Sequence, residues 1–566
     1  MSGKLGSSSS IGADEAASQE SIGQRRRFAF LRAQSLWVAA IFLLLTTIAA
    51  WPILADLDGV LVGQDSDVFI NPWADWWSAK ALADPDLGLW HSDYLFYPNG
   101  ADLHYHSFSH FNTAVSLLLQ PLLGQLPAYN LAILLNYVLA GLAMFQFVRY
   151  LTDSSPAALL AALVFAFNSH NLYQSAHPVL LGVWPLPWAG LFLLRAVREK
   201  SYTWALTAAL FVFLSAAVSM LMVLLMAWWL AFLLVYLLWR RELSLQSTRT
   251  ILTFVLASVI SCLPLVFPLL QEVVTNRDAS FIIDRSQSIL SLDVAGVLIP
   301  HWGVWYKRGI YFGIVPIFLL LVAVRRARTK GQQVLPWITL LFFTYLFAIG
   351  PDPTLAGSPL GISLPWTHLI VPLLRNPYRL NIILSLALSV LVALGWLEVS
   401  RTLPQGRAAR YGATAFLGLL LLLEYLAPGM PYTPVRISSF YTDNLDTVPD
   451  DVALAIVPTG RDEGKHYLFD QTFHGHKITS GVISRPSADA FAFVEDNALL
   501  RAGASDLEPA PIPTDLGPSL RELARHNVGY LIIDKRFDLD VEAWRAALES
   551  PVVYEDDLLL VYGIEQ

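Results

Sequence analysis

Two aspartates stand two positions apart soon after the first long apolar run of the sequence. Asp65 and Asp67 belong to the stretch Gly63 to Trp77, GQDSDVFINPWADWW. Such carboxylates could supply a general base, hold a divalent cation through the Asp-x-Asp pair, or do no more than form solvated turns. The aromatic helix that we expect next favours a functional role for Asp67, with Asp65 as the neighbouring candidate.

Two histidines are further candidates. His106 follows the turn Tyr97-Pro98-Asn99-Gly100, and His177 is the next-to-last residue of the stretch FNSHNLYQSAHP. A histidine beside a carboxylate-rich loop suits hydrogen bonding or proton transfer, so we predict substrate-binding roles for both. A zinc site has little support, because no cysteine and no HExxH arrangement accompanies them, and the metal ligands stay unknown. Polar anchoring at the membrane surface is the alternative for His177.

Two arginines lie four positions apart in the stretch LLRNPYRLNIILSL. Arg375 and Arg379 flank Pro377 at the start of a long apolar run. Guanidinium groups bind phosphate in a bidentate manner, so the pair suits a lipid phosphate or diphosphate at the level of the headgroups. Snorkelling towards ordinary lipid headgroups is the alternative.

Three tryptophans follow the aspartates at helical spacing. Trp73, Trp76 and Trp77 give the predicted helix an amphipathic face that we expect to lie in the membrane interface. This placement would hold the carboxylates close to the lipid headgroups.

The composition indicates that these residues belong to a polytopic membrane protein. Hydrophobic residues make up 55% of the 566 residues and charged residues only 14%, and the mean hydropathy is +0.50. The net charge of −8 points to no nucleic-acid partner. The single cysteine, Cys262, excludes an intrachain disulfide.

About eleven apolar runs are candidates for transmembrane helices. They begin with Leu36 to Leu54 and continue near residues 128–150, 156–170, 180–197, 202–219, 220–239, 250–271, 309–324, 334–350, 379–400 and 411–428. With a cytoplasmic N-terminus, the basic clusters after alternate runs all fall on the cytoplasmic side. This pattern predicts a multi-pass protein of the plasma membrane, and it requires that Phe111 to Leu123 does not cross.

The same topology predicts the domains. Residues 1–24 are polar and read as a disordered cytoplasmic tail, and residues 25–428 form the transmembrane domain with a large outer loop, 55–127. Residues 429–566 change to strand-like and helix-like patterns, which predicts a small extracytoplasmic α/β domain. The strand-like runs are Val452 to Val457, Val528 to Asp534 and Leu558 to Ile564, and the helix-like runs are Leu520 to His526 and Val541 to Leu548.

The sequence resembles the membrane-embedded GT-C glycosyltransferases, in particular poorly characterised bacterial members. The resemblance rests on GQDSDVFINPWADWW, LFYPNGADLHYHSFSHFN, AYNLAILLNYVLAG, FAFNSHNLYQSAHP, LLRNPYRLNIILSLALSVLVALG and FDQTFHGHKITSGVISRPSA. It implies a GT-C-like fold and transfer of a sugar, hexosyl or pentosyl, from a polyprenyl-phosphate donor in the membrane to a glycan, lipid or protein acceptor on the outer face.

The resemblance also implies roles for the candidates. Asp67 matches the base that accepts the proton of the acceptor hydroxyl, and Arg375 and Arg379 would steady the departing phosphate. Such a displacement inverts the anomeric centre. The acidic motif DSD is shorter than in better-known members, which leaves open both the metal dependence and whether the donor is a phosphate or a diphosphate. A divalent cation is the one candidate cofactor.

A non-catalytic transporter, flippase or lipid-binding assembly protein of the cell envelope is the alternative function. A transporter places ionisable residues within its spans. Here the apolar runs hold almost none, Glu424 being an exception, and the polar residues collect in the predicted outer loops. This distribution favours the enzyme.

Overall fold

The structure is a computed structural model of the chain. It describes residues 33–275, 290–300, 309–369, 374, 376–404, 406–426, 429–445, 448–484, 486, 488–506, 510–548 and 550–565. The predicted tail, residues 1–24, lies outside the described residues.

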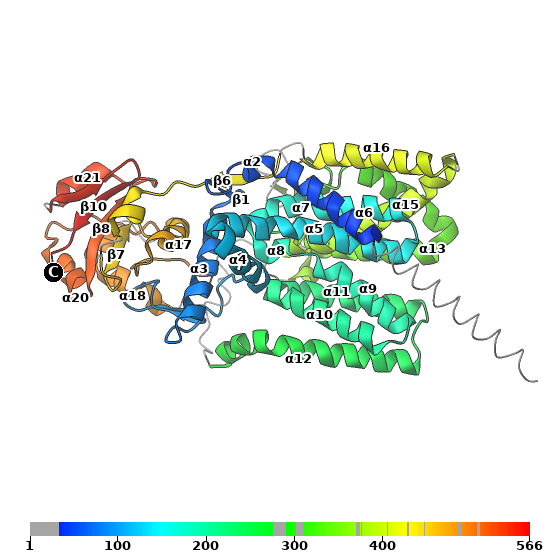
Figure 1. Ribbon diagram of the computed structural model, residues 1–566, viewed down its shortest axis with the longest axis horizontal. Helices are drawn as coiled ribbons and strands as arrows, with labels where there is room; N and C mark the ends of the chain where they lie inside the picture. Colours follow the sequence, from blue (N-terminus) through cyan, green and yellow to red (C-terminus); the bar gives the residue numbers. More distant parts are fainter. Residues whose placement is uncertain are drawn as a thin grey trace, which may run out of the picture.

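Helices dominate the part of the chain before residue 427 (Figure 1). Among the described residues, six helices are long and apolar enough to cross a membrane: Gln125–Thr152, Pro178–Arg198, Met220–Trp239, Leu245–Gln271, Pro377–Thr402 and Arg407–Leu426. The helices Ala33–Ala49 and Tyr202–Val218 are apolar but shorter. The chain is thus a multi-pass membrane protein, while the count of eleven spans stays a prediction.

In the described part of the chain, the bundle is built mainly from ten labelled helices. The ten are α5 (Gln125–Thr152), α6 (Ser155–Phe167), α8 (Pro178–Leu181), α9 (Pro185–Arg198), α10 (Tyr202–Val218), α11 (Met220–Trp239), α12 (Leu245–Thr275), α13 (Ile314–Ala348), α15 (Asn381–Thr402) and α16 (Arg407–Leu426). The span Pro178–Arg198 combines two of them, α8 and α9. Side-chain caps separate neighbours: Ser219 is extended and accepts hydrogen bonds from the amides of Leu221 and Met222, which ends α10 and starts α11.

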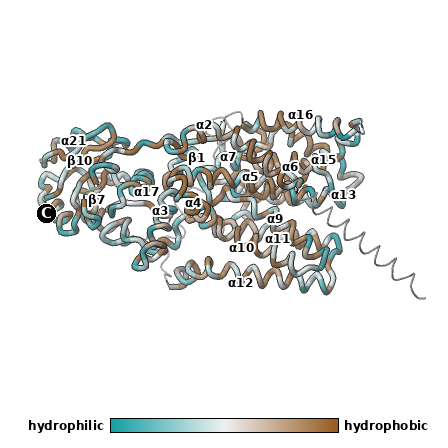
Figure 2. Tube along the Cα trace, in the orientation of Figure 1, coloured by the Kyte–Doolittle hydropathy of each residue, from teal (hydrophilic) through white to brown (hydrophobic). Residues whose placement is uncertain are grey.

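The helices differ in how much of their surface other helices cover. In α15, 83% of the apolar window is buried, whereas in α12 the figure is 17%. Leu256, Ile260 and Leu263 of α12 are more than half exposed and follow one another at helical spacing. Such a stripe suits hydrocarbon rather than water, and brown, the hydrophobic colour, covers much of the bundle in Figure 2.

The chain reverses direction within α13. Near its start, the amide of Phe312 donates to the carbonyl of Val297, and near its end, Tyr345 donates to the carbonyl of Val294. A straight helix of 35 residues would be about 50 Å long, so its ends could not both meet this four-residue turn (η4, Val294–Val297). The two apolar runs predicted at 309–324 and 334–350 therefore return to the same end of the bundle.

The first loop, residues 55–127, forms short elements. They are β1 (Val60–Val62), η1 (Ser66–Phe69), α3 (Ile70–Ala83), β2 (His91–Ser92), β3 (Ala101–Asp102) and α4 (His110–Leu123). The strand β1 pairs antiparallel with β6 (Tyr432–Pro434), which follows the last apolar helix. Asn130 of α5 fixes β1 by accepting from the amide of Val62 and donating to the carbonyl of Val60. At 14 residues, α4 is too short to cross a membrane, in agreement with the prediction.

The C-terminal domain contains a four-stranded sheet with the order β7-β8-β10-β9. Its elements are β7 (Ala453–Val457), α17 (Arg461–His474), α18 (Ala488–Asp496), α19 (Ala498–Ala502), α20 (Gly517–Arg525), β8 (Val528–Asp534), α21 (Val541–Ala547), β9 (Val552–Glu555) and β10 (Leu559–Gly563). β7 and β8 are parallel and the other pairs antiparallel. All three predicted strands and both predicted helices are confirmed, whereas α17, α18, α19 and β9 were not predicted.

The first loop and the C-terminal domain share one hydrophobic core. Trp73 and Trp77 of α3 are fully buried in it together with Tyr467 and Leu468 of α17. The indole of Trp73 donates a hydrogen bond of 2.6 Å to Gln471 Oε1. The prediction that these tryptophans face the membrane interface is therefore wrong, because α17 covers the apolar face of α3 and takes it out of contact with any lipid (Figure 1).

Candidate active site

Gly63 brings the first loop against the segment that carries His177. Its φ of +110° lies in the region that favours glycine, and an added Cβ would lie 2.6 Å from the backbone N and Cα of Ala176. The amide of Gly63 also donates to the carbonyl of Pro431, 2.8 Å away. Three distant parts of the chain therefore meet just before the two aspartates.

Asp65 begins the short helix η1. Its carboxylate accepts a hydrogen bond from the amide of Asp67, the usual role of an aspartate at a helix N-terminus. The hydroxyl of Tyr173 donates to its other oxygen at 3.3 Å. Asp65 thus orients η1 and links it to α7 (Ser169–Tyr173).

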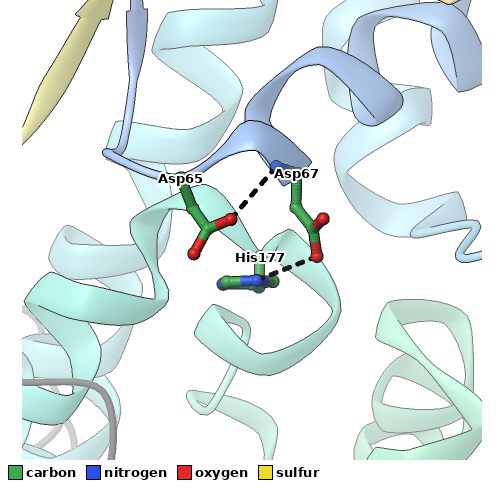
Figure 3. Close-up of side chains that lie close together, drawn as sticks. All are labelled: Asp65, Asp67 and His177. Carbon is green, nitrogen blue, oxygen red and sulfur yellow. Dashed lines mark hydrogen bonds and ion pairs between the residues drawn. The ribbon is translucent and has the colours of Figure 1, made fainter. Parts of the chain in front are cut away.

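Asp67 has a partner on each of its carboxylate oxygens. His177 Nε2 lies 3.1 Å from Oδ2, as Figure 3 shows, and Lys465 Nζ lies 2.7 Å from Oδ1. The side chain of Asp67 is 35% exposed, so other molecules can reach the carboxylate. The structure therefore brings together Asp65, Asp67 and His177, which the sequence analysis selected separately.

Lys465 was missed by the sequence analysis. It lies in the first half of α17, and its Nζ also contacts Ser66 Oγ and Asp462 Oδ1, both at 2.8 Å. The helix α17 lies between the C-terminal sheet and α3 in Figure 1, and Phe69 of η1 packs on it. A single lysine in a polar helix gives no signal in the sequence, because only the docking of α17 onto η1 places it at Asp67.

The electrostatics of the cluster favour the ionised carboxylate. Burial alone would raise the pKa of Asp67, but the hydrogen bond and charge of His177 and the charge of Lys465 outweigh it and hold the pKa well below its usual value. For Lys465, burial lowers the pKa, and the charges of Asp67 and Asp462 more than offset this. Asp67 and Lys465 therefore form an ion pair at neutral pH.

His106 lies elsewhere, in the core that the first loop shares with the C-terminal domain. Its ring contacts those of Trp73 and Phe108 at 5.2 and 5.0 Å, and neither ring nitrogen has a hydrogen-bond partner among the described residues. Burial lowers its pKa to about 3, so the ring is neutral at physiological pH. The tertiary structure gives His106 no contact with the Asp67 cluster.

Arg379 lies at the same end of the helical bundle as the aspartates. It belongs to η7 (Pro377–Leu380) and donates from Nη1 to the carbonyl of Leu374 at 2.9 Å. The short helix α7 connects the two places, because its His170 contacts the ring of Tyr378 in η7 while its Tyr173 binds Asp65. Arg375 lies outside the described residues.

Asp65, Asp67 and His177 could hold a metal ion. One ligand atom from each lies within 4.8 Å of the other two. Two carboxylates and an imidazole are chemically suited to a divalent cation. A cation would have to share Asp67 with the ammonium group of Lys465, which occupies Oδ1.

The sequence matches no known family model and no curated protein, but solved structures share its fold. The first is the oligosaccharyltransferase AglB from Archaeoglobus fulgidus in complex with an inhibitory peptide and a dolichol-phosphate. Its TM-score is 0.52 at 12% identity, over 89% of this chain and 70% of AglB. ArnT from Cupriavidus metallidurans, bound to undecaprenyl phosphate, matches with a TM-score of 0.52 at 16% identity. The match covers 94% of this chain and 98% of ArnT.

A third structure extends the comparison. The arabinofuranosyltransferase AftD from Mycobacteria gives a TM-score of 0.58 at 15% identity, over 94% of this chain but only 41% of AftD. All three belong to the GT-C superfamily, so the chain has the GT-C fold, and the resemblance seen in the sequence is confirmed at the level of the fold.

Proposed function

We propose that the protein is a membrane glycosyltransferase that moves a sugar from a polyprenyl-phosphate donor to an acceptor hydroxyl. The observation that carries the proposal is Asp67, a partly exposed carboxylate between His177 and Lys465, in a chain with the GT-C fold. AglB and ArnT, which share this fold, were solved with a dolichol-phosphate and with undecaprenyl phosphate. A hexose or a pentose is the transferred sugar, and a glycan, lipid or protein is the acceptor.

Asp67 is the proposed general base. It accepts the proton of the acceptor hydroxyl while the oxygen attacks the anomeric carbon, and the carbon–phosphate oxygen bond breaks with inversion. A carboxylate whose pKa is held low is a weak base, so we expect the acceptor hydroxyl to displace Lys465 from Oδ1 before the proton moves. His177 keeps the other oxygen in place.

Arg379 and Arg375 are the proposed partners of the departing phosphate. Arg379 lies in η7, just before the buried helix α15, at the end of the bundle where Asp65 and Asp67 lie. A guanidinium there would stabilise the charge that develops on the leaving group. The role of His106 in substrate binding is less direct, since it would support the loop that carries Trp73.

The site faces the outside of the cell in this proposal. The positive-inside rule puts the N-terminus in the cytoplasm, and the first loop and the C-terminal domain, residues 429–566, on the outer side of the plasma membrane. A donor whose sugar is presented at the outer leaflet would then meet an acceptor of the cell envelope.

The test is transfer of radiolabelled sugar from synthetic polyprenyl-phosphate hexose and pentose in membranes that contain the protein. We expect Asp67→Asn to lower the rate by about 10²- to 10⁴-fold, the usual contribution of a general base. Asp65→Asn should reduce transfer less, because the asparagine side-chain oxygen can still cap η1 and the base is retained. Wild-type transfer by both variants would show that the base is misassigned.

Mass spectrometry of lipids that copurify with the protein identifies the donor independently. A polyprenyl-phosphate sugar is the expected species. A protein that binds such a lipid yet transfers sugar from none of the donors would instead support the lipid-binding or flippase alternative.

A further inference from the structure

A cavity of about 240 Å³ lies beside the N-terminus of α17. Its wall is formed by residues 459–461 at the start of α17, by the segment 480–483 and by α18, and Phe96 of the first loop closes one side. The volume is slightly below the range of roughly 300–1,000 Å³ found for small-molecule sites. It suits one small ring rather than a long chain.

Aromatic and aliphatic side chains make up much of this wall. The rings of Phe96 and Phe491 lie 5.1 Å apart at 76°, with Phe96 buried and Phe491 38% exposed. Val482 and Ile483 are buried beside them. Such a surface accepts the C–H face of a ring that carries its polar groups at the edge.

Two hydroxyl-bearing residues stand in the same wall. Thr459 and Ser480 are only 6% and 4% exposed, and their side-chain oxygens have no hydrogen-bond partner among the described residues. A buried hydroxyl without a partner is costly and calls for an explanation. A ligand with several hydroxyls could supply the missing partners after a small rotation of either side chain.

The charges around the cavity disfavour an anion. Glu495 and Asp506 line it against one basic residue, Arg461, and Asp506 already accepts a hydrogen bond from the amide of Arg461 at 2.6 Å. Asp462 and Glu463 add negative charge in the first turn of α17. A phosphate would therefore meet net repulsion from the charged side chains, whereas a neutral polyhydroxyl ring would not.

The cavity adjoins the Asp67 cluster through α17. A side-chain carbon on Gly464 would lie 2.9 Å from the carbonyl oxygen of Gly481, so the wall 480–483 packs directly on the turn that carries Lys465. From Arg461 to Lys465 the helix rises about 6 Å, which is of the order of one sugar unit.

We propose that this cavity binds one neutral sugar ring of the acceptor, next to the unit whose hydroxyl meets Asp67. The inference rests on the proposed function and narrows its acceptor to a carbohydrate. It also assigns a role in acceptor binding to the C-terminal domain, because that domain supplies most of the cavity wall. The same domain contacts the proposed base through Lys465.

The test measures binding without turnover. Full-length protein in nanodiscs is titrated with methyl glucoside, methyl galactoside and methyl mannoside, and saturation-transfer-difference NMR reports binding. At least one glycoside should saturate, with about tenfold weaker binding to Phe491→Ala, which loses the aromatic face. Thr459→Val keeps the shape of the side chain without its hydroxyl and should also weaken binding.

Phe473→Ala is the matched control, because Phe473 is likewise 38% exposed in the C-terminal domain but is not in the cavity wall. Its binding should equal that of the wild type. The proposal is overturned if no glycoside saturates the wild type, if Phe491→Ala binds as the wild type does, or if inorganic phosphate displaces the glycoside.

The Asp67→Asn variant separates this inference from the proposed function. It should bind the glycoside normally while losing transfer. If Asp67→Asn loses transfer but the wild type binds no glycoside, the glycosyltransferase function is supported and the sugar-binding cavity is contradicted. If the protein binds a glycoside through Phe491 but transfers no sugar, the sugar-binding cavity is supported and the proposed reaction is contradicted.

Discussion

Lys465 Nζ lies 2.7 Å from Asp67 Oδ1, so a side chain of the C-terminal domain is paired with the proposed base of the first loop. The lysine is 7% exposed and contacts Ser66 and Asp462 as well. The ion pair therefore couples the position of the C-terminal domain to the protonation of Asp67.

The first prediction concerns the pH dependence of transfer. Lys465 favours the charged form of Asp67 and lowers its pKa, so Lys465→Met should raise that pKa and move the acidic limb of kcat/KM to higher pH. Lys465→Arg keeps the charge and should restore most of the wild-type profile. The measurement is the rate of sugar transfer from pH 8 down to the lowest pH at which the protein stays folded, because the wild-type limb lies below the usual range of a carboxyl group.

Lys477→Met is the control for that experiment. Lys477 forms an ion pair with Asp93 and so also links the C-terminal domain to the first loop, but it does not contact Asp67. Its acidic limb should stay in place. Superimposable profiles of Lys465→Met and the wild type would show that the ion pair does not act on the base.

A second prediction concerns divalent cations. Lys465 occupies one oxygen of Asp67, so Lys465→Met should expose a site made of Asp65, Asp67 and His177 and bind Mn²⁺ at least about tenfold more tightly than the wild type. Electron paramagnetic resonance of Mn²⁺ gives the affinity without an activity assay. Adding His177→Ala to Lys465→Met should abolish the increase in Mn²⁺ affinity. Equal Mn²⁺ affinities of Lys465→Met and the wild type would show that Lys465 does not compete with a cation for Asp67.

A third prediction tests the junction at Gly63. In Gly63→Ala the methyl group would meet the backbone of Ala176, so η1 must move away from His177. We expect loss of transfer and a destabilisation of about 1–3 kcal/mol from the left-handed backbone, seen as a lower Tm.

Gly124→Ala separates strain from contact. Gly124 also has a positive φ, +84°, but an added Cβ would meet nothing within 4 Å. The variant should be destabilised by a similar amount, because its backbone is strained in the same way, but it should keep its transfer activity. If both variants lose transfer equally, the close approach of Gly63 to Ala176 is unimportant for the site.

A fourth prediction uses Asp75 of α3, which is 3% exposed. Burial raises its pKa from 3.8 to about 6, despite hydrogen bonds from Thr113 and Ser116. The folded state therefore binds the proton more tightly than the unfolded state, and stability falls as pH rises from 3.8 to about 6, by up to about 3 kcal/mol.

Asp75→Asn removes this titration. The Tm of Asp75→Asn in detergent, relative to that of the wild type, should increase as the pH rises from 4 to 7. Asp86→Asn, at an exposed position of the same loop, should show no such increase. A difference in Tm between Asp75→Asn and the wild type that does not change with pH would mean that Asp75 is ionised throughout.

Much of the fold follows from local patterns. The apolar runs became helices because a backbone in hydrocarbon must satisfy its own hydrogen bonds, and Val528 to Asp534 became β8 because its residues suit a buried strand. Asp65 and Asp67 are neighbours in the sequence, so their proximity did not depend on tertiary structure. Two features of the site, the carboxylate pair and the helix that follows it, could therefore be predicted from the sequence alone.

Trp73 and Trp77 show the limit of such patterns. A tryptophan face looks the same in sequence whether lipid or protein covers it, and here α17 covers it. The same docking brings Lys465 to Asp67 and closes the cavity at Phe96. The sequence by itself determined which segments are apolar and where the acidic pair stands, because these depend on neighbouring residues. Only the tertiary structure decided the partners of Asp67, because they come from parts of the chain whose contact depends on how apolar faces pack together.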